Sequence, residues 1–143
     1  MSAGLSDKER EHLKERTAEL RREKRAGSGS KKAEADRAAL LAKIDGMSPP
    51  DRGLAERLHQ IITETAPELA PKLWYGQPAY ARKGKVVCFF RSGSDDGERY
   101  STFGFTPEAN LDDDGFWPTS FAVTELSARA EERITDMLRR ALA

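Results

Sequence analysis

The side chains best suited to nucleophilic or acid–base catalysis are few in this sequence. They are two histidines, His12 and His59, and a single cysteine, Cys88. A catalytic histidine needs a nucleophile and an orienting group within reach. Cys88 instead lies in the apolar run 86–90, where a lone cysteine is usually an unreactive small hydrophobic residue. The G-x-S-x-G, G-x-x-x-x-G-K-[ST] and G-x-G-x-x-G motifs are absent. We therefore predict a protein that is not an enzyme, with a Cys88–His59 dyad as the alternative.

A group of carboxylates is the candidate metal site. The group consists of Glu108, Asp112, Asp113 and Asp114. If residues 107–113 are helical, Glu108 and Asp112 share one face, and paired carboxylates bind hard cations or iron weakly. One cysteine and two distant histidines cannot supply the ligand spacing of a zinc site. The alternative is a solvated acidic turn, which is the usual role of a charge run.

An aromatic segment around Gly76 is the candidate ligand site. Glycine permits a positive φ and proline fixes φ, so the segment predicts a kinked corner between short strands, with aromatic side chains at its rim. Phe116-Trp117-Pro118 predicts a second corner of this kind. The candidate ligand-binding residues are Trp74, Tyr75, Gln77, Pro78, Tyr80 and Trp117. Ligand clefts are mostly apolar with a few polar groups; the alternative is a set of core aromatics whose polar tips reach the edge.

The elements that would position these residues follow from hydrophobic periodicity and capping signals. Helices are predicted over 7–25, 33–46, 49–66 and 127–142, and strands over 73–75, 79–81, 86–90, 99–105 and 119–123. Residues 92–97 are predicted as a loop, and 106–115 as a short helix or turn. Strands that follow one another, with helices outside them, predict an α+β fold: an antiparallel sheet of about four to five short strands with helices on one face.

The N-terminal region differs in composition from the rest of the chain. Residues 1–30 predict a charged helix and a flexible Gly/Ser linker, whereas all eleven aromatic residues lie between Trp74 and Phe121, so that 31–143 is the predicted α+β domain. A polar helix of this kind is usually a solvated extension. The alternative is an arm that binds a partner or nucleic acid, because residues 1–37 carry eleven basic and eight acidic side chains.

Charge and hydropathy limit the classes of partner. The 143 residues carry 24 basic and 24 acidic side chains, so the formal net charge is zero. This balance argues against the broad basic field of a protein that binds nucleic acid or anionic lipid. The sequence has no run of about 18 apolar residues and no apolar segment typical of a signal peptide. We therefore expect a cytoplasmic protein without a membrane partner, and nucleic acid is not the expected ligand.

Three segments of the chain resemble the YdhG-like family of small bacterial domains. They are Trp74-Tyr75-Gly76-Gln77-Pro78-Ala79-Tyr80, Gly84-Lys85-Val86-Val87-Cys88-Phe89-Phe90 and Phe103-Gly104-Phe105. The resemblance covers residues 38–143, and the family often has methionine in place of Gln77. It implies a frataxin-like α+β fold. Some members are labelled iron chaperones, which makes iron the cofactor that the resemblance implies.

These observations together give two functional expectations. The first is a non-enzymatic domain that holds a small ligand or a protein segment at the aromatic corner. The second is a frataxin-like chaperone that binds iron through the surface carboxylates.

Overall fold

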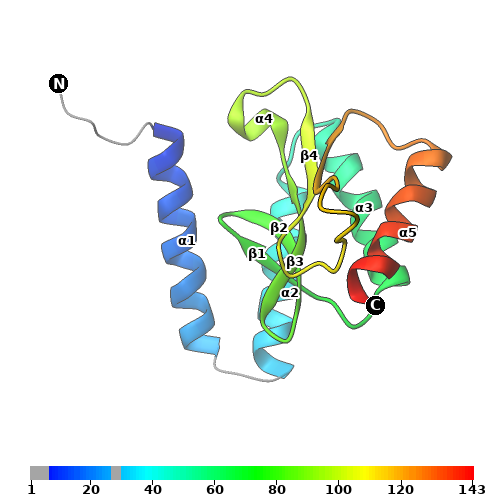
Figure 1. Cartoon of the computed structure of the whole chain (residues 1–143). Coiled ribbons are helices and arrows are strands. Elements are labelled where there is room, and N and C mark those ends of the chain that lie inside the picture. Colours follow the sequence, from blue (N-terminus) through cyan, green and yellow to red (C-terminus); the bar gives the residue numbers. More distant parts are fainter. Residues whose placement is uncertain (1–6, 27–29) are drawn as a thin grey trace.

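The computed structural model describes residues 7–26 and 30–143. These residues contain five helices and five strands, joined by turns and loops (Figure 1). The predicted linker residues 27–29 lie outside the described residues. The helices are α1 (Asp7–Ala26), α2 (Ser30–Asp45), α3 (Asp51–Thr65), α4 (Gly93–Asp96) and α5 (Ala128–Leu142). The strands are β1 (Ala70–Trp74), β2 (Gln77–Arg82), β3 (Lys85–Arg91), β4 (Ser101–Phe105) and β5 (Ser120–Val123). No helix among these described residues is long and apolar enough to cross a membrane.

The five strands form one antiparallel sheet in the order β1-β2-β3-β4-β5, which confirms the predicted α+β class. Two very short turns hold its first three strands together. Tyr75 and Gly76 join β1 to β2 and have φ values of 51° and 77°, while Trp74 pairs with Gln77. Lys83 and Gly84 join β2 to β3 in the same way. Two consecutive positive φ values are typical of the type I′ turn, whose twist matches that of the flanking strands. The predicted kinked corner is therefore the tight turn of a hairpin.

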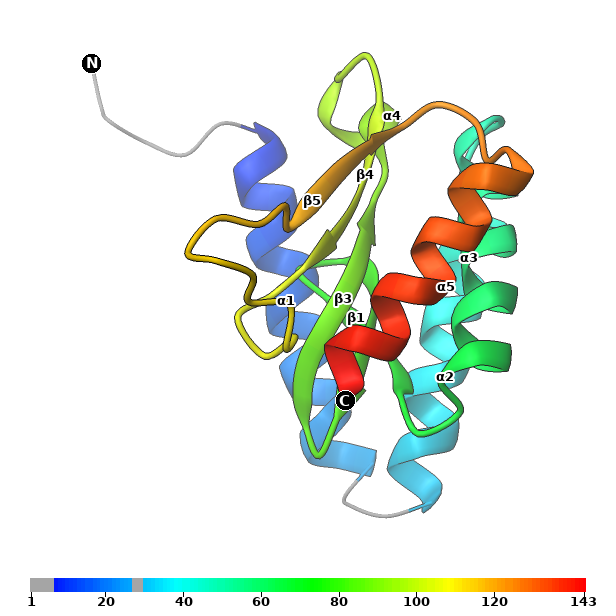
Figure 2. The ribbon, with the colours of Figure 1, turned by 45° about the vertical axis from the view of Figure 1, so that its right-hand side comes forward.

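The core lies between the sheet and helices α2, α3 and α5. Tyr80, Phe90 and Phe103 are its largest fully buried side chains. Leu40 of α2, Leu58 and Ile62 of α3 and Leu138 of α5 cover them from the helical side. The described core contains no residue of α1. In both views the sheet lies between α1 and the pair α3 and α5 (Figure 2).

One connection differs from the prediction, and a second takes one of its two predicted forms. The loop 92–97 contains the short helix α4, because the Ser92 hydroxyl caps its first turn by accepting from the Asp95 amide and Gly97 ends it at a φ of 68°. The segment after β4, predicted as a short helix or turn, contains turns and no helix. The condition for a shared helical face of Glu108 and Asp112 is therefore not met.

Candidate functional site

The surface of the corner is made of aromatic rings that touch in a row. Tyr75 is 49% exposed and Trp74 is half-buried. The ring centroids of Trp74 lie 5.2 Å from those of Tyr75 and 5.5 Å from those of Phe89, which is within the range of favourable ring contacts. A side chain at Gly104 would overlap the Phe89 ring, so the glycine lets that ring lie against the β4 backbone. Trp74 and Tyr75 are thus the accessible members of the predicted corner.

The other three predicted corner residues point inward. Pro78 is fully buried, and Gln77 and Tyr80 are 6% and 1% exposed. The Gln77 amide donates to Asp95 Oδ2 at 3.1 Å, and its carbonyl oxygen accepts from the Ser92 amide at 3.2 Å. These three side chains are therefore packed inside the protein and do not line an open cleft. The polar groups of Gln77 are already paired there.

Burial also shifts the pKa values of Tyr80, His59 and Cys88. The Tyr80 hydroxyl lies 2.9 Å from His59 Nδ1, and burial raises the pKa of Tyr80. Burial, together with the nearby Arg37 guanidinium, lowers the pKa of His59 below 6.5. Cys88 is 0% exposed, and burial raises the pKa of its thiol far above the ordinary value. The hydrogen-bond partner of His59 Nδ1 is therefore Tyr80, and Cys88 is a buried thiol.

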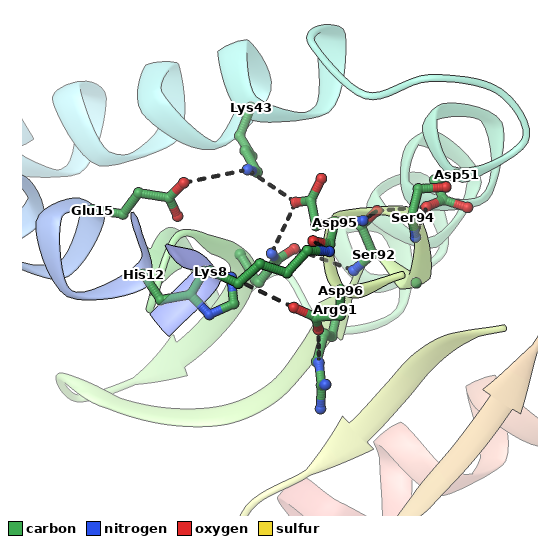
Figure 3. A network of polar contacts seen from close by, with 12 residues as sticks. Lys8, His12, Glu15, Lys43, Asp51, Arg91, Ser92, Ser94, Asp95 and Asp96 are labelled. Atoms are coloured by element: carbon green, nitrogen blue, oxygen red, sulfur yellow. Dashed lines mark hydrogen bonds and ion pairs between the residues drawn. The ribbon is translucent and has the colours of Figure 1, made fainter. Parts of the chain in front are cut away.

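A polar network joins α1 to the outer side of the corner (Figure 3). Lys8 donates to the Asp95 carbonyl oxygen, and His12 Nε2 lies 3.6 Å from Asp96 Oδ1. Glu15 Oε1 lies 3.9 Å from Lys43 Nζ, which is also 3.2 Å from Asp95 Oδ2. Because Lys8, His12 and Glu15 are spaced at i, i+4 and i+7, they lie on one face of α1. That face rests on α2 and α4.

The same helix reaches the turn of the corner. The Arg16 guanidinium lies 5.4 Å from the centre of the Tyr75 ring, in a cation–π contact. A side chain at Gly76 would collide with Glu15. The close approach of α1 to the turn therefore requires glycine at position 76. Burial raises the pKa of Glu15 above 4.5, and Lys43 and His12 offset only part of this effect. The residues Lys43, Tyr75, Gly76, Asp95 and Asp96 together form what we term the corner surface.

A second part of the network holds α4 in place beneath the corner surface. The Asp51 carboxylate, at the start of α3, accepts from the Ser92 hydroxyl at 2.5 Å and from the Ser94 amide at 3.1 Å. Burial alone would raise the pKa of Asp51, but hydrogen bonds from Ser92, Ser94 and Ser101 outweigh it and hold the pKa below 3.8. The Arg91 guanidinium donates to Asp96. Asp95 and Asp96 are therefore held on a fixed backbone.

The predicted metal residues lie elsewhere, in the connection between β4 and β5. Glu108, Asp112, Asp113 and Asp114 are all exposed there. Within residues 7–26 and 30–143, no group of three or more histidine, cysteine, aspartate or glutamate side chains is arranged to hold a metal ion. The structure therefore does not gather these four carboxylates into a binding site.

Trp117 is also separate from the corner. It is half-buried and lines a hollow of about 230 Å³ between the β4–β5 connection and α5, with Leu111, Pro118 and Met137. None of the residues that line this hollow belongs to the corner. The two predicted aromatic corners are thus two different places on the molecule.

Comparisons with protein-family models, with curated proteins and with solved structures found no match. Sequence reasoning identified Trp74, Tyr75 and Gln77 but missed Lys8, Lys43 and Asp51. The one signal available for α1 was the i, i+4, i+7 spacing of its polar residues, which many solvated helices share.

Proposed function

We propose that this chain is a cytoplasmic, non-enzymatic binding domain of the YdhG-like type, with a frataxin-like fold, that holds a charged helical protein segment at the corner surface. The observation that carries this proposal is the docking of α1. A helix with no member in the described core lies on Tyr75, Gly76, Lys43 and α4 through polar contacts. A surface that accepts this helix within the chain has the geometry and charge to accept a similar helix from a partner.

The strength of these contacts fits reversible binding. Exposed ion pairs and exposed cation–π contacts each contribute at most about 1 kcal/mol. The contacts from Lys8, His12, Glu15 and Arg16 therefore stabilise the docked helix by only a few kcal/mol in all. A partner segment can compete with α1 at this level, whereas a helix with a large apolar face would be difficult to displace.

The test uses a synthetic peptide of residues 7–26 and a fragment of residues 30–143. The fragment retains every residue of the described core, and circular dichroism with thermal unfolding checks that it folds. Because the contacts are weak, we expect a dissociation constant on the order of 1 mM, which an NMR titration of the labelled fragment can measure. Amide signals of Lys43, Tyr75, Gly76 and α4 should move.

Charge reversal on the fragment provides the control. Lys43→Glu should abolish the shifts, and Lys85→Glu should leave them unchanged, because Lys85 is an exposed lysine on the β2–β3 hairpin, away from the corner surface. Raising the salt concentration should weaken binding. Shifts that are absent, or that persist equally in both variants, would refute the proposal.

A further inference from the structure

A cavity of about 160 Å³ lies between β5 and α5, away from the corner surface. We propose that this cavity binds a small monocarboxylate whose other end is a compact apolar group, such as a phenyl ring or a branched alkyl chain. The proposal concerns a separate part of the molecule and does not depend on the function proposed for the corner surface.

The walls of the cavity are apolar and reach the core. The large apolar side chains that line it are Phe103, Phe121, Val123, Leu126, Ile134 and Met137. Phe103 is 1% exposed and Ile134 is 8% exposed, so the cavity reaches down to side chains of the packed core. An apolar protein cavity of about 150 Å³ holds one benzene molecule. The space in this cavity therefore suits a group of about six carbon atoms.

One cation lies beside this apolar space. The Arg133 guanidinium lies 6.0 Å from the centre of the Phe121 ring, and both residues line the cavity. Among the described residues, no carboxylate lies within 4.0 Å of the Arg133 nitrogen atoms. A guanidinium binds a carboxylate through two parallel hydrogen bonds, and such charge-assisted bonds are stronger than neutral ones. The ligand class that matches this pair of features has an apolar body and one terminal carboxylate.

One acidic residue, Glu125, borders the same cavity. Its negative charge repels an anion and would favour a cation. The cavity therefore contains two opposite charges, and either one could determine which ligand binds. If Arg133 governs recognition, removal of the Glu125 charge should leave carboxylate binding unchanged or strengthen it. If Glu125 governs recognition, an amine of the same shape should bind better than the carboxylate.

The experiment compares three probes of the same shape on the full chain: 3-phenylpropanoate, 3-phenylpropanamide and 3-phenylpropan-1-amine. Binding is measured by NMR titration and by the rise in melting temperature. We expect 3-phenylpropanoate to bind at least about tenfold more tightly than the amide and the amine, and to shift the amide signals of Phe121 and Met137.

Two matched variants complete the test. Arg133→Gln should lower the affinity for 3-phenylpropanoate by about tenfold or more, towards that of the amide, and Glu125→Gln should not lower it. Both positions are exposed, so both variants are expected to fold. Equal binding of carboxylate and amide, tighter binding of the amine, an unchanged affinity in Arg133→Gln or no binding of any probe would each overturn the proposal.

Discussion

His59 and Tyr80 form a hydrogen-bonded pair between α3 and the sheet, at the edge of the core. When the imidazole carries its proton on Nε2, the Tyr80 hydroxyl donates to Nδ1. A protonated imidazole cannot accept this bond, and burial already disfavours its charge. The folded protein therefore favours the neutral form of His59, which connects this residue to the stability of the whole domain.

This preference makes the stability of the domain depend on pH. The pKa of His59 lies below 6.5 in the folded protein, so the unfolded chain binds a proton more readily as the pH falls. The contribution of His59 to stability is complete above about pH 6.5 and is lost as the pH drops through that value. Melting temperatures at about pH 7.5 and about pH 5.5 should show a larger decrease for the wild type than for His59→Gln. Equal decreases in both proteins would show that His59 is not responsible.

Cys88 shows that the sequence can predict the burial of a single residue. Its position in a run of β-branched and aromatic residues predicts a buried, inert thiol, and its complete burial follows from that pattern. The partner of Gln77 could not be predicted in the same way, because Asp95 lies 18 residues further along the chain, in a different element. Hydrophobic patterns predict burial, whereas polar pairing depends on how distant segments meet.

Gly76 and Gly84 are matched positions in the two short turns of the sheet. Both have positive φ values, 77° and 81°, so alanine is strained at either position. A side chain at Gly76 would also collide with Glu15 of α1, whereas a side chain at Gly84 would meet no atom within 4 Å. Substitutions at the two glycines therefore distinguish two losses of stability. One comes from backbone strain in the turn, and the other from the lost contact with α1.

Alanine at each glycine tests this difference in the full chain. Gly84→Ala should lower the free energy of unfolding by about 1 kcal/mol through backbone strain. Gly76→Ala should lower it further, by about 1 kcal/mol more, because it also disturbs the docking of α1. Urea unfolding measures both, and in a Glu15→Ala background the two costs should become equal. Equal costs in the wild-type background would mean that α1 does not contact the turn in solution.

At this scale the sequence predicted long elements better than short ones. Helix α5 begins after Ser127, whose hydroxyl accepts from the Ala130 amide, as the capping signal predicted. Helix α3 begins at Asp51 rather than at position 49, and its N-cap Pro50 makes no side-chain capping bond. Helix α4 has only four residues and too little periodicity to detect. Its N-cap, Ser92, also donates to the Asp51 carboxylate, which comes from a distant part of the chain.

The relation between α1 and the remainder of the chain is the main feature at the scale of the whole molecule. The described core is built mainly from α2, α3, α5 and the sheet. Helix α1 lies on the other side of the sheet from α3 and α5 (Figures 1 and 2) and makes polar contacts with α2 and α4. Composition predicted an α+β domain of residues 31–143, and the members of the described core run from Leu40 to Ala141. It could not predict the docking of α1, since Lys8 and Asp95 are 87 residues apart.

A charge exchange between Glu15 and Lys43 tests the docking of α1 directly. Its effect is measured by hydrogen exchange of the α1 amides in the full chain. The single variants Glu15→Lys and Lys43→Glu should each speed exchange in α1, and the double variant should restore part of the protection. Exchange in α5 serves as the internal control and should stay constant. If α1 exchanges at the same rate in all four proteins, α1 is not held by the corner surface.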